Sequence, residues 1–139
     1  DSCLVGSEMC IRDRLKIKQE NIKLKGSSIE CRINAEHPES FIPSPGKITQ
    51  YHQPGGLGIR VDSAVYDGYS IPSHYDSMIG KLITYGATRS EALKKMNRAL
   101  EEYVIMGINT NIQLHQKIIQ TDEFKRGSYN INFMSNLIE

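Results

Sequence analysis

The clearest pattern in the chain is a strict alternation of apolar and polar residues over positions 29–36, IECRINAE. Apolar side chains occupy every second position, and the positions between them hold Glu30, Arg32, Asn34 and Glu36. Successive side chains of a β-strand point to opposite faces. The pattern therefore predicts a strand with one buried face and one polar face, on which an arginine stands between two carboxylates.

Other short runs predict the rest of a sheet. Residues 15–24 alternate around a polar centre at 19–21, which predicts a hairpin-like pair of strands closed by Gly26. Further strands are predicted at 47–53, 57–63 and 78–86, with a turn at 54–56. The prolines and the glycine of HPESFIPSPGK, residues 37–47, predict an irregular loop.

The second half of the chain changes to a helical period. Thr88 and Glu91 have the spacing of a capping box and predict a helix that ends at Gly107. Thr110 and Gln113 predict a second helix start, and residues 131–139 form a last amphipathic segment. Strands followed by helices predict an α+β domain in which an antiparallel sheet precedes amphipathic helices.

Composition restricts the class of protein. The 139 residues have the length of one ordinary domain, and 39% of them are hydrophobic. The mean hydropathy of −0.41 is that of a soluble protein. With 17 basic and 16 acidic residues the net charge is +1, which gives no electrostatic reason to expect nucleic acid or an anionic membrane as a partner. No apolar run approaches the roughly 18 residues of a membrane span.

The cysteines and histidines form no recognisable metal or catalytic motif. Cys3, Cys10 and Cys31 include no C-x-x-C pair, and the four histidines lack ligand spacing. Cys31 falls on the apolar side of its strand, so we interpret it as a small buried hydrophobe in a protein of a reducing compartment. No phosphate-binding glycine loop is present in the sequence, and we expect no metal site.

Two interpretations of the polar strand face follow from the residues alone. It is either a solvated face with cross-strand ion pairs, or a site at which flanking carboxylates hold Arg32 and present its planar guanidinium to an oxygen of a ligand. The segment HYDSMIGK, residues 74–81, is either a turn with a capping aspartate or the rim of the same site.

Four segments together resemble a known family. IECRINAEHPESFIPSPGKI, PGGLGIRVDS, YDSMIGKLITYG and GINTNIQLHQKII are similar, in order, to the carboxy-terminal domain of biotin carboxylases, from about residue 15 to the end. The resemblance implies an α+β fold of barrel-sandwich-hybrid type. It is greatest to the free-standing subunit of bacterial and plastid acetyl-CoA carboxylase, although propionyl-CoA, methylcrotonyl-CoA and pyruvate carboxylases contain related domains.

The resemblance also implies site residues. Arg32 matches the family arginine that contacts the ureido oxygen of biotin, where a guanidinium would stabilise negative charge that develops as a ureido nitrogen loses its proton. We expect Glu30 and Glu36 to orient that guanidinium. Leu57 and Arg60 fall in a strand that contributes to the family's homodimer interface, and Leu57 stands where a relative has phenylalanine, which predicts a weaker contact.

The implied reaction is carboxylation of biotin on its carrier protein with ATP and bicarbonate, the first half-reaction of acetyl-CoA carboxylase in fatty acid synthesis. ATP, Mg²⁺ or Mn²⁺ and bicarbonate would bind mainly to an ATP-grasp region that precedes this segment in the family. We expect the chain to be an inactive fragment by itself. In the complete enzyme we expect homodimerisation, with the biotin carboxyl carrier protein and carboxyltransferase subunits as partners, in the cytoplasm or plastid stroma.

Residues 1–14 do not resemble the family, and we interpret them as an artefactual leader before a domain that spans 15–139. The alternative from another functional class is a non-catalytic module for dimerisation or carrier docking. Arg32 separates the two hypotheses, because a docking module has no need of a guanidinium held between carboxylates.

Overall fold

The computed structural model describes residues 17–138. Its strands are β1 (Ser27–Asn34), β2 (Gly46–Lys47), β3 (Gln50–His52), β4 (Ile59–Ser63), β5 (Ser70–Ile71), β6 (Met78–Gly86) and β7 (Val104–Met106). Its helices are the 3₁₀ turn η2 (Gln19–Asn21), α1 (Arg89–Glu102), α2 (Ile112–Gln120), α3 (Asp122–Arg126) and α4 (Phe133–Ile138). The predicted leader, residues 1–14, lies outside the described residues.

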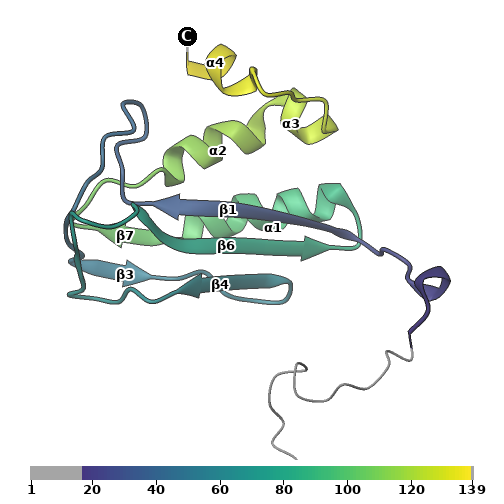
Figure 1. Cartoon of the computed structure of the whole chain (residues 1–139), viewed down its shortest axis with the longest axis horizontal. Coiled ribbons are helices and arrows are strands. Elements are labelled where there is room, and N and C mark those ends of the chain that lie inside the picture. The colour runs from purple at the N-terminus through teal and green to yellow at the C-terminus, as the bar shows by residue number, and fades with distance from the viewer. Residues whose placement is uncertain (1–16, 139) are drawn as a thin grey trace, which may run out of the picture.

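The centre of the fold is an antiparallel sheet of three strands in the order β1-β6-β4. Two small antiparallel pairs, β2–β5 and β3–β7, extend the strand layer. Helix α1 packs against β6 and β1, and α2 contacts both α1 and β1 (Figure 1). The predicted α+β class with an antiparallel sheet is therefore confirmed, although β7 follows α1 and the strands do not all precede the helices.

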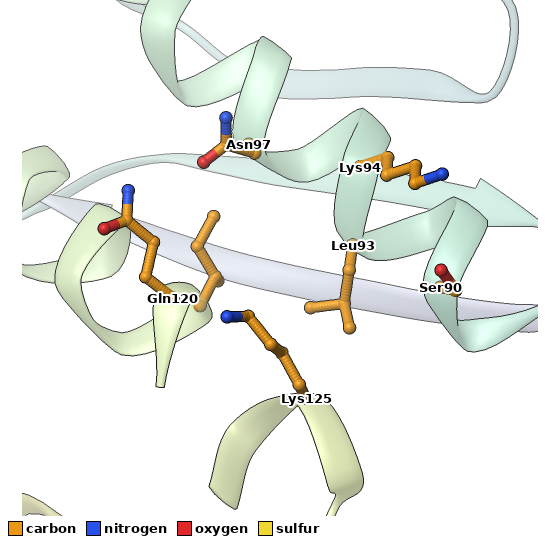
Figure 2. A pocket seen from close by; sticks show the side chains of 7 residues that line it. Ser90, Leu93, Lys94, Asn97, Gln120 and Lys125 are labelled. Carbon is orange, nitrogen blue, oxygen red and sulfur yellow. The ribbon is translucent and has the colours of Figure 1, made fainter. Parts of the chain in front are cut away.

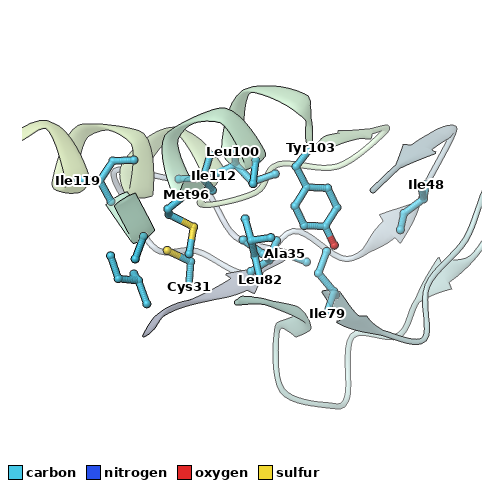
Figure 3. Packing of buried hydrophobic residues seen from close by; sticks show 14 of the residues in the cluster. Cys31, Ala35, Ile48, Ile79, Leu82, Met96, Leu100, Tyr103, Ile112 and Ile119 are labelled. Atoms are coloured by element: carbon cyan, nitrogen blue, oxygen red, sulfur yellow. The ribbon is translucent and has the colours of Figure 1, made fainter. Parts of the chain in front are cut away.

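The core forms where β1, β6, α1 and α2 meet (Figure 3). Ile33 on β1, Leu82 on β6 and Met96 on α1 are each fully buried. Burial of such a side chain stabilises the fold by roughly 1.5–3 kcal/mol. Thr84 is a buried polar exception, and its hydroxyl donates to the Ala92 carbonyl oxygen at 3.0 Å, so its polar atom is satisfied and ties β6 to α1.

Helix α1 begins as its sequence predicts. The Thr88 hydroxyl accepts a hydrogen bond from the Glu91 backbone N–H at 3.2 Å, and the Glu91 carboxylate accepts one from the Ala87 N–H at 2.8 Å. The predicted end at Gly107 is wrong, because the helix stops at Glu102 and residues 104–106 pair with β3 as strand β7. Backbone pairing with β3 thus replaces the last helical turn.

Three other local predictions are also corrected. The hairpin predicted from residue 15 to 24 is not formed over its described part, where Ile17, Ile22 and Leu24 are 68%, 54% and 98% exposed. An isolated pair of strands is marginal without a third strand or helix to cover its apolar face. The strand predicted at 47–53 is divided between β2 and β3. Helix α2 starts after Asn111, and the predicted Thr110 cap is not used.

Candidate functional site

The polar face of β1 is present as the sequence predicts. Ile29, Cys31 and Ile33 are only 6%, 5% and 0% exposed, whereas Glu30 and Arg32 between them are exposed. Burial raises the pKa of the Cys31 thiol to about 12, with a further contribution from the negative charge of Glu30. Cys31 is therefore a neutral core residue, as predicted, and the polar side of the strand is available for chemistry.

The guanidinium of Arg32 lies beside the start of β6. Its Nε donates to the Met78 sulfur at 3.2 Å. Its two terminal nitrogens make no hydrogen bond and no ion pair with any residue between 17 and 138, so their donors are available. A planar guanidinium with unused donors is suited to bind a carbonyl, carboxylate or phosphate oxygen.

The two flanking carboxylates have other partners. Glu30 forms an exposed ion pair with Lys81, with Oε1 and Nζ 3.8 Å apart. Glu36 accepts hydrogen bonds from the Asn34 amide at 3.3 Å and from the Ser77 hydroxyl at 3.2 Å. The direct contact through which we expected Glu30 and Glu36 to orient Arg32 is therefore not formed within the described chain, and an orienting role for either residue stays a prediction.

The segment between residues 74 and 81 combines both interpretations that the sequence left open. The carboxylate of Asp76 accepts from the Met78 backbone N–H at 2.9 Å, so it caps the turn into β6. The same turn places Met78 against Arg32. This segment is therefore a capped turn and one side of the Arg32 site.

Two residues that contact Arg32 were missed by sequence reasoning. The side-chain amide of Asn111 donates to the Arg32 carbonyl oxygen at 3.1 Å, and Nε2 of His115 lies 2.8 Å from the same oxygen. Burial lowers the pKa of His115 below its usual value, while the hydrogen bond to Arg32 and the charge of Glu36 oppose that shift. Both residues come from the start of α2. Their sequence signal was weak, because an asparagine before an apolar helix predicts a cap and a lone helical histidine predicts ordinary packing.

The predicted interface residues lie at the opposite edge of the sheet, in and just before β4. Leu57, in the turn before β4, is 93% exposed. Arg60 is also exposed, and its Nε donates to the Asp62 carboxylate at 2.8 Å. This hydrogen bond lowers the pKa of Asp62 and raises that of Arg60. Both predicted residues are thus accessible to a partner, and their interface role stays a prediction.

Other features of the described chain add no second chemistry. No group of three His, Cys, Asp or Glu side chains between residues 17 and 138 could hold a metal ion. A hollow of about 500 Å³ lies between α1 and the α2–α3 pair, with Leu93, Ile119 and Lys125 among its lining residues (Figure 2). It includes none of the predicted site residues. No helix in this part of the chain is long and apolar enough to cross a membrane.

Comparison with known proteins supports the resemblance. Residues 30–136 match the model of the "Biotin carboxylase C-terminal domain" family. A biotin carboxylase of Haemophilus influenzae is 56% identical over 120 residues, which cover 86% of this chain and 27% of that protein. A pyruvate carboxylase subunit of Methanothermobacter thermautotrophicus is 50% identical over 123 residues, which cover 88% of this chain and 25% of that protein.

A solved structure agrees. The biotin carboxylase domain dimer of Hydrogenobacter thermophilus 2-oxoglutarate carboxylase, in complex with MgADP, ADP and bicarbonate, matches with a TM-score of 0.88 and 41% identity. The match covers 93% of this chain and 29% of that one. The chain thus spans little more than a quarter of the length of the relatives that it matches. From the position of these matches and the shared fold, the chain belongs to the biotin carboxylase C-terminal domain family.

Proposed function

We propose that this chain is the biotin-side domain of an ATP-dependent biotin carboxylase, a ligase that carboxylates biotin on its carrier protein. The observation that supports the proposal most strongly is the state of Arg32. It lies within the matched region, it is exposed on β1, and the donors on its terminal nitrogens are unused by the rest of the described chain.

The proposed role of Arg32 follows from its chemistry. When a ureido nitrogen of biotin is deprotonated, negative charge develops on the ureido oxygen. A guanidinium remains protonated at any physiological pH, and two of its N–H groups can converge on the lone pairs of such an oxygen. The available terminal nitrogens of Arg32 fit this group, and a fixed donor aimed at developing charge lowers the barrier more than it strengthens ground-state binding.

We further propose that the remaining components act on other parts of the complete enzyme. ATP, Mg²⁺ or Mn²⁺ and bicarbonate would bind mainly to an ATP-grasp region. The bound MgADP and bicarbonate of the Hydrogenobacter relative support their use. That relative is also a dimer, which supports a homodimer here with Leu57 and Arg60 at its interface. The biotin carboxyl carrier protein and the carboxyltransferase subunits complete the proposed assembly.

For the acyl acceptor we propose acetyl-CoA, so that the enzyme would serve fatty acid synthesis. The similarity to a Haemophilus influenzae protein named biotin carboxylase favours this class. The similarity to a pyruvate carboxylase subunit supports pyruvate as the second candidate. The rates at which the complete enzyme carboxylates purified carrier proteins of acetyl-CoA carboxylase and of pyruvate carboxylase distinguish the two candidates. A biotin carboxylase of acetyl-CoA carboxylase should carboxylate the carrier of its own class faster.

A chimeric enzyme tests the proposed function. The 120-residue region of the Haemophilus influenzae biotin carboxylase is replaced by the matching region of this chain, and carboxylation of free biotin is measured with ATP and bicarbonate. We expect an active chimera, whereas the same protein without the region should be inactive. A chimera that binds ATP and the carrier protein but does not carboxylate biotin would contradict the proposal and support a docking module.

A further inference from the structure

The backbone of β1 needs partners on the side away from β6. Among residues 17–138, β1 is an end strand of its sheet, so its outward N–H and C=O groups have no neighbouring strand there to bond. A buried backbone group without a hydrogen-bond partner destabilises the fold. Three of these groups, the Arg32 carbonyl and the N–H and carbonyl of Asn34, are bonded by side-chain and backbone groups of Asn111 and His115 at the start of α2.

Asn111 takes the place of a neighbouring strand. Its side-chain amide donates to the Arg32 carbonyl oxygen at 3.1 Å, and its side-chain oxygen accepts from the Asn34 N–H at 2.9 Å. Its own backbone N–H donates to the Asn34 carbonyl oxygen at 3.2 Å. With only 5% of its surface exposed, Asn111 thus bonds one group of each of the three peptide units that follow Arg32.

His115 adds a second donor from the next turn of α2. Its Nε2 lies 2.8 Å from the Arg32 carbonyl oxygen. An oxygen of this kind only accepts, so the ring must carry its proton on Nε2. The His115 backbone N–H in turn donates to the Asn111 carbonyl oxygen at 3.1 Å, which fixes the two side chains relative to each other. The carbonyl of Arg32 is thus held by two donors at once.

The same stretch of β1 is irregular. The register with β6 shifts between Ile33 and Asn34, where Ile79 is the extra residue on β6. The regular ladder therefore ends one residue after Arg32, and past that point the contacts with β6 no longer fix the strand direction alone. Asn111 bonds the outward edge of β1 both before and after this irregularity, at Arg32 and at Asn34, and His115 bonds it before, at Arg32.

We propose that Asn111 and His115 are positioning residues for Arg32, which set the direction of its side chain by fixing its peptide unit; this inference rests on the proposed function. Neither residue needs to touch biotin. Their effect on the reaction would pass through the placement of the guanidinium, for which an error of about 1 Å can cost up to 10²-fold in rate.

The chimeric enzyme allows a sharp test. Asn111→Asp keeps the shape and the acceptor but loses the donor to Arg32, and His115→Phe keeps a ring but loses its N–H. Each should lower kcat/KM for biotin about tenfold to a hundredfold and leave KM for ATP unchanged. His115→Gln, which retains an N–H donor, should restore most of the loss. Gln116→Leu is the matched control, because its amide donates from the same helix to the Leu100 carbonyl oxygen at 3.2 Å, away from Arg32.

A double-mutant cycle then separates positioning from a general loss of stability. In an Arg32→Ala background, Asn111→Asp and His115→Phe should each change kcat/KM for biotin less than about twofold, since no guanidinium is left to misplace. If either variant lowers kcat/KM for biotin further in the Arg32→Ala background, the inference is overturned and the proposed function stands. The same holds if Gln116→Leu lowers kcat/KM as much as the two variants do. An Arg32→Ala enzyme with normal turnover would instead overturn the proposed function and the inference with it.

Discussion

The two edge strands of the central sheet differ in the hydrogen bonds that their outer backbone groups make. Both β1 and β4 pair with β6, yet the free edge of β1 is bonded by Asn111 and His115 near Arg32. Within residues 17–138, the β4 backbone beyond Ile59 forms no hydrogen bond except with β6, and that strand exposes Arg60 and Asp62. One edge is thus fixed inside the domain, and the other is open to another surface.

This difference shows which edge suits a catalytic group and which suits an interface with a partner. A group that must meet reacting atoms needs a fixed backbone, and the covered edge supplies one for Arg32. An uncovered edge invites association unless charged side chains limit it. The charged pair on β4 is consistent with an edge that accepts only a complementary partner, as the proposed dimer requires.

The largest expected contrast between the two strands is chemical reactivity. With a pKa of about 12, Cys31 on β1 should be about one part in ten thousand thiolate at pH 8, against about a quarter for an ordinary cysteine. In a chain in which serine replaces Cys3 and Cys10, alkylation of Cys31 should be at least about 10³-fold slower than that of an introduced Arg60→Cys. Mass spectrometry of timed samples measures both rates. Equal rates would show that the inner face of β1 is accessible.

Core truncation should also distinguish the strands. Ile33 on β1 is fully buried, whereas Ile59 on β4 is half-buried. Ile33→Ala should lower the free energy of unfolding by about 2–5 kcal/mol, and Ile59→Ala by clearly less, because the second site leaves a smaller cavity. Urea denaturation of the two variants supplies the comparison. A larger loss at Ile59 would contradict the assignment of the core to the β1 side.

A smaller effect is expected at the open edge. If Arg60 lies in a two-fold contact, Arg60→Glu should raise the dimer dissociation constant of the chimeric enzyme roughly tenfold, since each change acts twice and opposes Asp62. Thermal stability of the chain itself should hardly change. Sedimentation over a dilution series checks the prediction, with exposed Lys94→Glu on α1 as a charge-matched control. An unaltered dissociation constant would show that Arg60 on β4 does not contribute to the dimer interface.

The sequence predicts the elements better than the contacts between them. The alternation of IECRINAE is visible because burial on β1 follows the strand period, and the Thr88 cap of α1 is likewise a local signal. The bonds from Asn111 and His115 to Arg32 join residues 79 and 83 positions apart, and no local period encodes them. The alternation from residue 15 to 24 predicted a hairpin that is not formed over its described part. A strand period forms a stable strand only where another element covers its apolar face.

The carboxylates beside Arg32 show the same limit. Alternation correctly places Glu30 and Arg32 on one face of β1, with Glu36 just beyond its end. Cross-strand geometry then decides their partners, and it pairs Glu30 with Lys81 of β6 and brings Met78 to Arg32. Both partners are diagonal neighbours on β6, because the residues directly opposite Glu30 and Arg32 are Ile83 and Lys81. Long side chains still reach each other across such a diagonal. The presence of an exposed arginine at the site was therefore predictable, whereas the residues that contact it were not.

The most direct test of the central claim is the turnover of Arg32 variants in the chimeric enzyme. If Arg32 stabilises charge that develops on the ureido oxygen, Arg32→Ala should lower kcat about 10²–10³-fold with an unchanged thermal midpoint and unchanged ATP affinity. Arg32→Lys should restore only part of the rate, because an ammonium lacks the planar fork. An alanine variant with normal kcat, or one whose lost activity follows its lost thermal stability, would contradict the account.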